Sequence, residues 1–448
     1  MKKRVFQQVG CLPRSGSLYC EAVNKTLDGL MSRFRLNKLL LTGVSEVGAI
    51  AFALVLSSWY WQIDEHAVFI LILFLSAALF FGRRLSLTLQ SGSGIALVLY
   101  LLLLMWVLIS TLWSATFALS LSYASLVFLI GIAAVLLGAT FGLERVMLGL
   151  WLGVVVISLH GLLRAFGAGG SWRNYFVNPE NGPGIEGSAW GLFTNPISLA
   201  VLLGLAIFAL IFGLGGQPAS WVAAFIFGIP FLFGITTIGI LASQVALVGA
   251  IAVGIATWHA RRSQGNWKTL LSWGYPAVAL LAGIVFWLLR EPILRPLGEA
   301  PDFSGRTILW DWYFEAFLWN PVIGAGWGSA PTGWPLSKDN FAPVKEYFMA
   351  HNGFIDLGIM LGGVGVLLLV GTLVTLFITG AKRGTSRDHS ARWIFIPVLI
   401  TYLTLNDLFS SLYPRFLGFF LIGIMVGVLL RDSTKEGTPH AVESNPQV

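Results

Sequence analysis

The chain has 448 residues, of which 56% are hydrophobic and 11% are charged, whereas an average soluble domain is about 45–50% apolar and about 25% charged. This composition excludes a soluble globular protein. The apolar residues form uninterrupted blocks rather than short alternating segments, which excludes a transmembrane barrel. The sequence therefore predicts an all-α, polytopic integral membrane protein.

The net charge of +7 could indicate a nucleic-acid partner or an acidic membrane surface. Which of these applies depends on where the charges lie in the chain. Eight of the 28 lysines and arginines fall in the first 38 residues, a basic tail without an apolar stretch of the signal-peptide type. We therefore expect residues 1–38 to be a retained cytoplasmic tail and expect no nucleic-acid partner. Cys11 and Cys20 lie in this tail, and their spacing indicates neither a disulfide framework nor a metal site.

Hydropathy divides the rest of the chain into four parts. Residues 39–289 should form a bundle of about nine transmembrane helices, 290–350 a long outer loop, 351–430 three more helices, and 431–448 a polar cytoplasmic tail. The roughly twelve expected spans, most of them close to the ~20 residues that a membrane helix needs, cover residues 39–58, 66–82, 94–113, 119–142, 145–166, 196–214, 219–235, 239–258, 270–289, 353–380, 393–410 and 414–430.

The distribution of basic residues predicts the orientation. Twenty lysines and arginines fall in segments on the side of the N-terminus, and only Arg164, Arg173 and Arg415 fall in short loops on the other side. Because cytoplasmic loops are enriched in Lys and Arg, both termini should be cytoplasmic and the long loop should be outside. No internal repeat is visible, which disfavours a transporter built from two related halves.

Polar and ionisable side chains share the outer edge of the predicted bundle. Ionisable groups within spans are costly and are candidates for function, so a site is expected at this edge. The residues concerned are His160 and Arg164 at the end of the fifth span, His351, Asn352 and Asp356 at the start of the tenth, Asn406 and Asp407 at the end of the eleventh, and Arg415 at the start of the twelfth.

The long loop contains an amphipathic segment, Arg306 to Trp319. Apolar residues recur every three to four positions, and the acidic Asp311 and Glu315 lie on the other side, which predicts a helix lying in the interface over the bundle mouth. The apolar face is formed by Ile308, Leu309, Trp312, Ala316 and Phe317. Asn320-Pro321 should end the helix, and a glycine-rich turn, Gly324 to Gly328, follows without the Gly-Lys-Ser or Gly-Lys-Thr of a phosphate-binding loop.

Five of the 18 tryptophans fall in this loop, namely Trp310, Trp312, Trp319, Trp327 and Trp334. They fit either an interfacial aromatic belt or a platform on which sugar rings stack.

An outer site with arginine and histidine suits a lipid-linked phosphate. Arginine grips phosphate oxygens in a bidentate fork, and histidine can take a hydroxyl proton as a general base. Neither role needs a metal or a cofactor, and no metal-binding cluster is evident on this side. Taken alone, His351 fits a helix cap or a polar contact equally well, and Arg306 fits a lipid headgroup contact.

The run His351-Asn352-Gly353-Phe354-Ile355-Asp356 resembles the signature of the O-antigen ligase and polymerase superfamily of bacterial envelope glycan assembly. Three other elements agree in order, and the likeness covers residues 185–430 well. They are Ser304-Gly305-Arg306-Thr307 with Asn320-Pro321, Gly191 to Pro196 at the start of a middle span, and Ala242-Ser243-Gln244-Val245. The last departs from the family, because Gln244 stands where many members carry an arginine.

The resemblance implies an all-helical glycosyltransferase similar to the GT-C class, located in the bacterial inner membrane with its site facing the periplasm. The donor would be a glycan on undecaprenyl pyrophosphate, and the acceptor either a growing glycan or lipid A core. By this likeness His351 would activate the acceptor and Arg306 would hold the pyrophosphate. Arg164, Arg415, Asn352, Asp356, Gln244 and His160 are the further candidates for substrate binding.

Exopolysaccharide polymerases of the ExoQ type give the best match, and ligases that act on lipid A core match nearly as well. Two readings from other classes remain. A flippase or transporter would need ionisable groups through the whole depth, whereas the inner half offers little beyond Glu46. In a purely structural scaffold, the spacing of Gly358 and Gly362 would serve only to pack helices closely.

Overall fold

A computed structural model describes residues 47–51, 53–54, 92–167, 196–213, 241–262, 288, 291–292, 306–328, 350–387, 389–408 and 416–436. Within these ranges every regular element is helical. Four helices are long and apolar enough to cross a membrane, Ser93–Trp113, Phe117–Leu159, Ser243–Arg262 and Gly353–Thr385, and Val201–Phe212 and Phe416–Arg431 are shorter apolar helices. The predicted all-α membrane class is confirmed to this extent. The expected spans 66–82 and 219–235 and nearly all of 270–289 lie outside the described residues.

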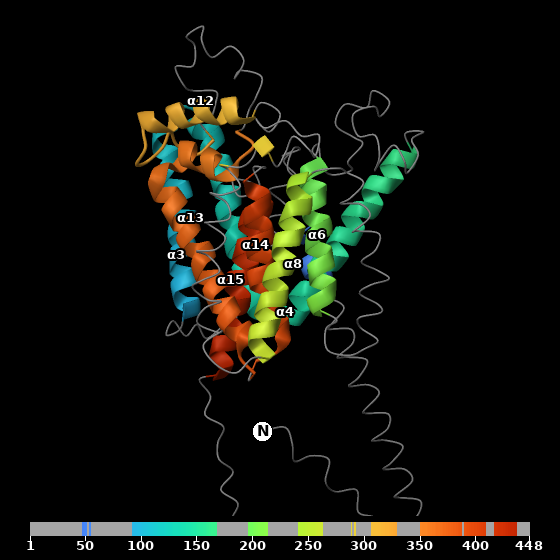
Figure 1. The fold of residues 1–448 in the computed structure, drawn as a ribbon. Coiled ribbons are helices and arrows are strands. Elements are labelled where there is room, and N and C mark those ends of the chain that lie inside the picture. The colour runs from blue at the N-terminus through green and yellow to red at the C-terminus, as the bar shows by residue number, and fades with distance from the viewer. Residues whose placement is uncertain are drawn as a thin grey trace, which may run out of the picture.

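The described helices form an upright bundle with one helix lying across its end (Figure 1). Their bounds are α3 (Gly92–Ser110), α4 (Phe117–Gly167), α6 (Pro196–Gly213), α8 (Leu241–Arg262), α12 (Arg306–Trp319), α13 (Gly353–Thr385), α14 (Phe395–Asp407) and α15 (Phe416–Glu436), with short 3-10 turns at Thr111–Trp113 and Ala391–Ile394. The end covered by α12 is called the upper end below, and the opposite end the lower end. Most helix bounds agree with the predicted spans within a few residues, but α15 continues to Glu436, into the segment expected to be a polar tail.

Helix α4 contains two of the predicted spans, 119–142 and 145–166. Its backbone leaves the helical conformation at Gly142, where φ is 75° and ψ is 167°, a combination open essentially only to glycine. The half before Gly142 packs against α15, and the half after it packs against α6 and residues 47–54. A single glycine therefore replaces the expected loop between the two spans.

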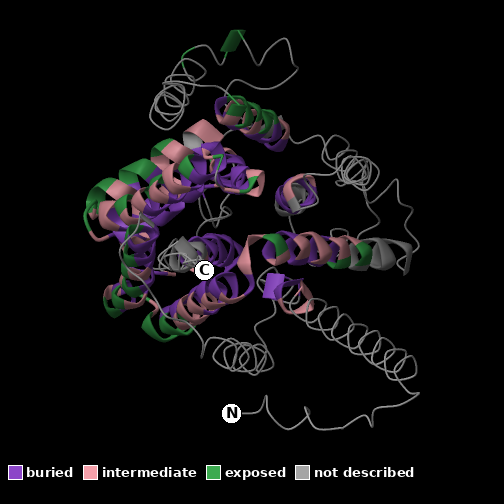
Figure 2. Cartoon of the chain, turned by 90° about the horizontal axis from the view of Figure 1, so that it is seen from below, coloured by how far each residue is buried: buried purple, intermediate pink, exposed green. Residues whose placement is uncertain are grey.

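The outer surface of the bundle is apolar, as a lipid environment requires. In α3 the exposed side chains recur every three to four residues, as Ile95, Val98, Leu102, Met105 and Ile109. Figure 2 shows the same arrangement for several helices, whose exposed residues point outward while their buried residues face the centre.

Helices α4 and α15 touch through glycines. A Cβ atom on Gly138 would lie 2.1 Å from the carbonyl oxygen of Ile424, and one on Gly427 would lie 2.0 Å from that of Val135. Such close approach of backbones is how membrane helices gain packing energy without a hydrophobic driving force between them. Helix α3 is joined to the same helix by the Tyr100 hydroxyl, which donates to the Phe419 carbonyl of α15 at 2.5 Å.

Replacing Gly427 by alanine should therefore destabilise the bundle, because backbone atoms rather than flexible side chains would have to move. We expect a loss of about 3 kcal/mol or more, at the upper end of the range for overpacked cores. Gly371→Ala is the matched control, since its Cβ would lie 3.4 Å from Leu99, an ordinary contact. Thermal unfolding followed by tryptophan fluorescence in detergent should show a lower Tm for Gly427→Ala only. Equal Tm values would contradict the tight α4–α15 contact.

Arginines gather at the lower end and donate to backbone carbonyls of other elements. The Arg261 guanidinium donates to the carbonyl of Gly384 in the last turn of α13 and to those of Ser386 and His389 after it. Arg383 donates to the Leu429 carbonyl at 3.1 Å, and Arg431 donates to the Thr140 carbonyl. Cations are favourable at helix C-termini, where the dipole is negative and carbonyls lack partners. The described residues of the segments predicted to be cytoplasmic thus meet at one end, and Arg306, His351, Asn352 and Asp356 lie at the other.

Candidate functional site at the upper end

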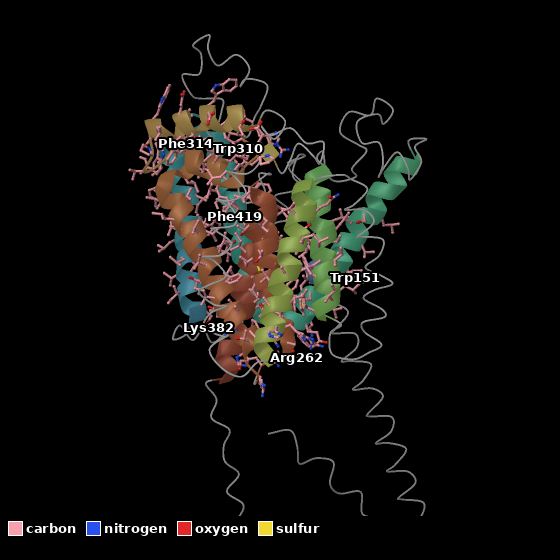
Figure 3. All side chains as sticks on the ribbon, in the orientation of Figure 1. Trp151, Arg262, Trp310, Phe314, Lys382 and Phe419 are labelled. Atoms are coloured by element: carbon pink, nitrogen blue, oxygen red, sulfur yellow. The ribbon has the colours of Figure 1, made fainter. Side chains whose placement is uncertain are left out.

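Helix α12 has the predicted bounds and lies flat across the upper end of the bundle (Figures 1 and 3). Leu309, Tyr313 and Ala316 are its buried residues, whereas Asp311 and Glu315 are exposed as expected. The predicted apolar face is correct for Leu309 and Ala316, but Trp312 and Phe317 are only half-buried.

Helix α12 ends before Asn320-Pro321, as its sequence predicts, and Asn320 closes the turn that follows. Its side-chain amide donates to the Gly324 carbonyl at 2.8 Å, and its own carbonyl accepts from the Gly324 amide at 2.9 Å. The turn then runs along α13, and a Cβ on Gly324 would lie 2.5 Å from the amide nitrogen of Gly362. The glycine-rich segment is thus in backbone contact with a membrane helix.

Helix α13 is interrupted at Gly362, where φ is 66° and ψ is −172°. Around this break, the backbone groups of α13 pair with the turn. The Ala325 amide donates to the Ile359 carbonyl at 2.7 Å and the Gly326 amide to the Met360 carbonyl at 2.9 Å. In the other direction, the Gly363 amide donates to the Pro321 carbonyl at 2.7 Å, and the Val364 amide to the Val322 carbonyl at 3.2 Å.

The indole of Trp106 in α3 donates to one further carbonyl at the break, that of Leu361, at 2.9 Å. Irregular backbone at membrane depth is tolerated only where its polar groups find partners. Here the turn and one tryptophan supply them, which makes residues 320–326 a fixed part of the bundle. This corrects the expectation for the glycines: Gly362 contacts the turn rather than a second helix, and a Cβ on Gly358 would meet Phe317 only at 3.4 Å.

His351 lies in a tight turn immediately before α13. Its φ of 53° is the only positive value among the described non-glycine residues, a conformation that histidine, asparagine and aspartate visit more often than other side chains. Asn352, not His351, caps the helix, because its side-chain oxygen accepts from the amides of Phe354 and Ile355 at 3.1 and 3.2 Å. The turn therefore presents His351 from a capped helix end.

Two further hydrogen bonds hold this turn from both sides. The Ala350 amide donates to the Asp356 carboxylate at 2.7 Å, and the Trp310 indole of α12 donates to the Ala350 carbonyl at 2.8 Å. Arg306 begins α12 one helical turn before Trp310, on the same face. The structure thus connects the helix that carries Arg306 to the residue next to His351.

The C-terminal end of α14 completes this end of α13. A Cβ on Gly353 would lie 1.9 Å from a carboxylate oxygen of Asp407, so the fully buried Asp407 lies against the residue that begins α13. Its neighbour Asn406 accepts a hydrogen bond of 2.7 Å from Ser243 of α8. Gln244, which stands at the departure from the family motif, is half-buried beside Ser243.

The electrostatics of this region are set by two buried carboxylates, Asp356 and Asp407, at the N-terminus of α13. A helix N-terminus stabilises negative charge through its unpaired amides and its dipole. Burial and the charge of Asp356 raise the pKa of the Tyr313 hydroxyl well above its usual value. The raised pKa keeps the Tyr313 hydroxyl protonated even well above physiological pH.

For three of the predicted site residues, the structure does not describe a side chain near His351. His160 and Arg164 lie in the last turns of α4, and only their backbone is described. In Figures 1 and 2 that end of α4 points away from the bundle and from α12. Arg415 lies outside the described residues. The described parts of the candidate site are therefore His351, Asn352, Asp356, Arg306 and Gln244.

The outer-loop tryptophans divide into two kinds. Trp310 is engaged with the His351 turn, and Trp327 is buried against Phe419 with ring centroids 5.8 Å apart, so both are structural. Trp312 is half-buried and Trp319 is 57% exposed, which leaves them open to lipid or sugar. Trp334 lies outside the described residues.

Sequence reasoning missed Tyr313, Trp106 and the break in α13. Tyr313 and Trp106 each carry one polar atom within an apolar segment. The sequence pattern does not indicate which group that atom contacts. The pair Gly362-Gly363 in the middle of a span was a usable signal, because adjacent glycines are a common cause of kinks.

No protein-family model matches the chain. Over 167 residues it is 29% identical to the exopolysaccharide production protein ExoQ of Rhizobium meliloti (strain 1021). The matched region covers 35% of this chain and 37% of that protein, so the alignment spans little more than a third of the relative's length. This similarity supports the resemblance to the O-antigen ligase and polymerase superfamily that the motifs around Arg306 and His351 indicate.

Proposed function

We propose that the protein is a membrane glycosyltransferase of the O-antigen ligase and polymerase superfamily, acting in exopolysaccharide or O-antigen biosynthesis. It would use a glycan linked to undecaprenyl pyrophosphate and act at the upper end of the bundle, which the loop charges predict to be periplasmic. A polymerase, with a growing glycan as acceptor, is the leading form. A ligase that transfers the glycan to lipid A core is the alternative.

One observation carries this proposal: His351 is held in a left-handed turn whose neighbours are fixed by Trp310, Asn352 and Asp356. Unusual backbone conformations cost about 1–3 kcal/mol and persist where the surroundings over-determine them, typically at functional sites. The hydrogen bonds of Asn352 and Asp356 favour a positioning role for both in this turn. Their role in substrate binding would then be indirect.

In the proposed reaction the acceptor hydroxyl attacks the anomeric carbon of the donor glycan. His351 takes the hydroxyl proton, the bond between the anomeric carbon and the pyrophosphate oxygen breaks, and undecaprenyl pyrophosphate leaves with the bonding electrons. Arg306 neutralises the pyrophosphate through a bidentate fork. Tyr313, neutral and beside Asp356, has no assigned step and is a packing residue of α12.

The transporter alternative is less well supported by the described residues. Their buried charged side chains are Asp356 and Asp407 at the upper end and Arg383 at the lower end, so no charged path crosses the bundle there. Broken helices in transporters offer unwound backbone groups to the substrate. At Gly362 the corresponding groups are paired with residues 321–326 and Trp106, which leaves the break closed.

The direct test is incubation of the purified full-length protein with a defined oligosaccharide on undecaprenyl pyrophosphate. A ladder of longer products is expected for a polymerase. Single transfer that requires added lipid A core would instead identify a ligase. Absence of transfer under both conditions, together with movement of the intact donor across liposome membranes, would replace the enzyme by a flippase.

Arg306→Lys tests the pyrophosphate contact in the same assay. A lysine keeps the charge but cannot form the fork, and hydrogen bonds to charged groups contribute about 1.5–3 kcal/mol each. We expect the transfer rate to fall by roughly tenfold to a hundredfold. The matched control is Arg392→Lys, an ion pair with Glu144 at 2.8 Å at the lower end. Similar small effects in both variants would remove Arg306 from the site.

A further inference from the structure

Helix α8 carries an exposed apolar stripe that ends in aromatic and basic residues. Val245, Val248, Ile251 and Ile255 are 43–67% exposed and recur every three to four residues toward the lower end. One turn later the stripe reaches Trp258, which is 37% exposed. Exposed apolar side chains over this length fit lipid acyl chains, so the stripe marks a face of the bundle that lipid covers.

At the end of the stripe the Arg262 guanidinium lies over the Trp258 ring, 4.8 Å from its centroid. Both Arg262 and Arg387 are exposed. Arg387 donates to the Arg262 carbonyl at 3.1 Å, which places a second guanidinium against the backbone at the end of α8. Figure 3 shows Arg262 at the lower tip of the bundle, opposite α12.

Two other charged groups among the described residues at this end are engaged within the protein. Arg261 donates to three carbonyls at the end of α13 and just after it, and the acidic Glu144 is paired with Arg392 at 2.8 Å. Arg262 instead rests on an aromatic face, which orients the guanidinium without neutralising it. In the described structure, the exposed Arg262 guanidinium therefore lies at the lower end of an apolar stripe that a lipid acyl chain could cover.

We propose that this surface, formed by Trp258, Arg262 and Arg387 with the α8 stripe, binds one anionic phospholipid. The phosphate of the headgroup lies against the two guanidinium groups, and an acyl chain follows Ile255, Ile251 and Val248 toward the bilayer centre. Tryptophan is enriched at the membrane–water interface because its ring is amphipathic. Basic pockets beside membrane helices recognise anionic headgroups by the same charge complementarity.

The chain contains a matched control. Helix α13 also carries an exposed apolar stripe, Leu367, Val370 and Val374, which leads to the exposed Lys382 at the same end. No aromatic ring stacks on Lys382 among the contacts of the described residues. Lys382 therefore has the charge and the apolar stripe but lacks the stacked arginine.

The test is native mass spectrometry of the full-length, delipidated protein titrated with phosphatidylglycerol or with phosphatidylcholine of the same acyl chains. We expect one phosphatidylglycerol to be retained in preference to phosphatidylcholine. Arg262→Gln should weaken its retention roughly fivefold, the contribution of one basic residue at an anionic surface. Trp258→Leu should also weaken it, whereas Lys382→Gln should leave it unchanged.

Equal losses in Arg262→Gln and Lys382→Gln would overturn the proposal, because they would show only general attraction to a basic surface. Displacement of the lipid by inorganic phosphate would also overturn it, in favour of a free-anion site. Tm values of all variants equal to that of the wild type would exclude misfolding as the cause. The site is at the opposite end from His351, so this experiment stands apart from the test of the glycosyltransferase.

Discussion

His351→Asn and His351→Gly should both abolish glycan transfer while leaving the protein folded. General bases contribute typically 10²–10⁴-fold to a rate, and we expect a loss in this range. These substitutions are chosen because of the backbone: at φ of 53°, asparagine and glycine adopt the left-handed conformation readily, whereas alanine adds about 1–2 kcal/mol of strain. The two variants therefore remove the imidazole without distorting the turn that Asn352 and Asp356 hold.

The measurement is the initial rate of product formation from the undecaprenyl-linked donor, with Tm recorded for each variant. His389→Asn is the control, because His389 lies at the lower end, where its backbone carbonyl accepts from Arg261. Undiminished transfer by His351→Asn would eliminate the general-base role. If only His351→Ala lost activity, the conformation of the turn rather than the imidazole would be the requirement.

Gly362→Ala should be the most damaging single methyl group in the described bundle. Its φ of 66° and ψ of −172° lie in a region that is essentially closed to other residues. The added Cβ would also lie 2.2 Å from the Val322 carbonyl oxygen. Relief of that clash would separate residues 320–326 from α13 and leave backbone groups at membrane depth without partners, at a cost of several kcal/mol for each unsatisfied group.

Gly358→Ala provides the comparison on the same helix. Its Cβ would meet Phe317 at 3.4 Å, an ordinary contact, and alanine is the better helix former by up to about 1 kcal/mol. We therefore expect Gly358→Ala to match or exceed the wild-type Tm and Gly362→Ala to be poorly folded or strongly destabilised. The reverse order would show that this glycine pair packs two helices and that the break at Gly362 is not required.

The break also connects stability to the site. Residues 320–326 join α12 to the middle of α13, and Trp310 of α12 joins it to the His351 turn. Helix α12 is thus fixed to α13 at both of its ends. We expect partial separation at Gly362 to change the position of Arg306 relative to His351, because both belong to this one assembly.

Much of this arrangement follows from the sequence. An apolar block must bury its backbone polar groups in helical hydrogen bonds inside a membrane, which fixes α3, α6, α8 and α13 within a few residues. The alternation of apolar and acidic residues gives the bounds of α12. The clustering of arginines at one end follows from the loop charges, although their contacts with carbonyls do not.

The contacts that define the site could not be derived in this way. His351 is recognisable as a candidate, but the turn that holds its left-handed backbone also depends on a partner from another element, Trp310 of α12, which donates to the Ala350 carbonyl. Asn352 is a residue type typical of helix N-caps, and the structure shows it in that role. The family resemblance alone instead implies a contact of Asn352 with substrate. Hydropathy treats α13 as one continuous span, since it averages over the glycines that allow the break.

Local sequence patterns are enough to predict a helical membrane protein and the bounds of most of its described helices. Each of these properties depends on residues close together in the chain. Two other features come from contacts between distant segments: the turn after α12 fills the interruption in α13, and Trp310 of α12 binds the carbonyl beside His351. Those outcomes depend on which donor meets which carbonyl across elements as far apart as those of Trp106 and Leu361, and a local pattern of hydropathy does not contain that pairing.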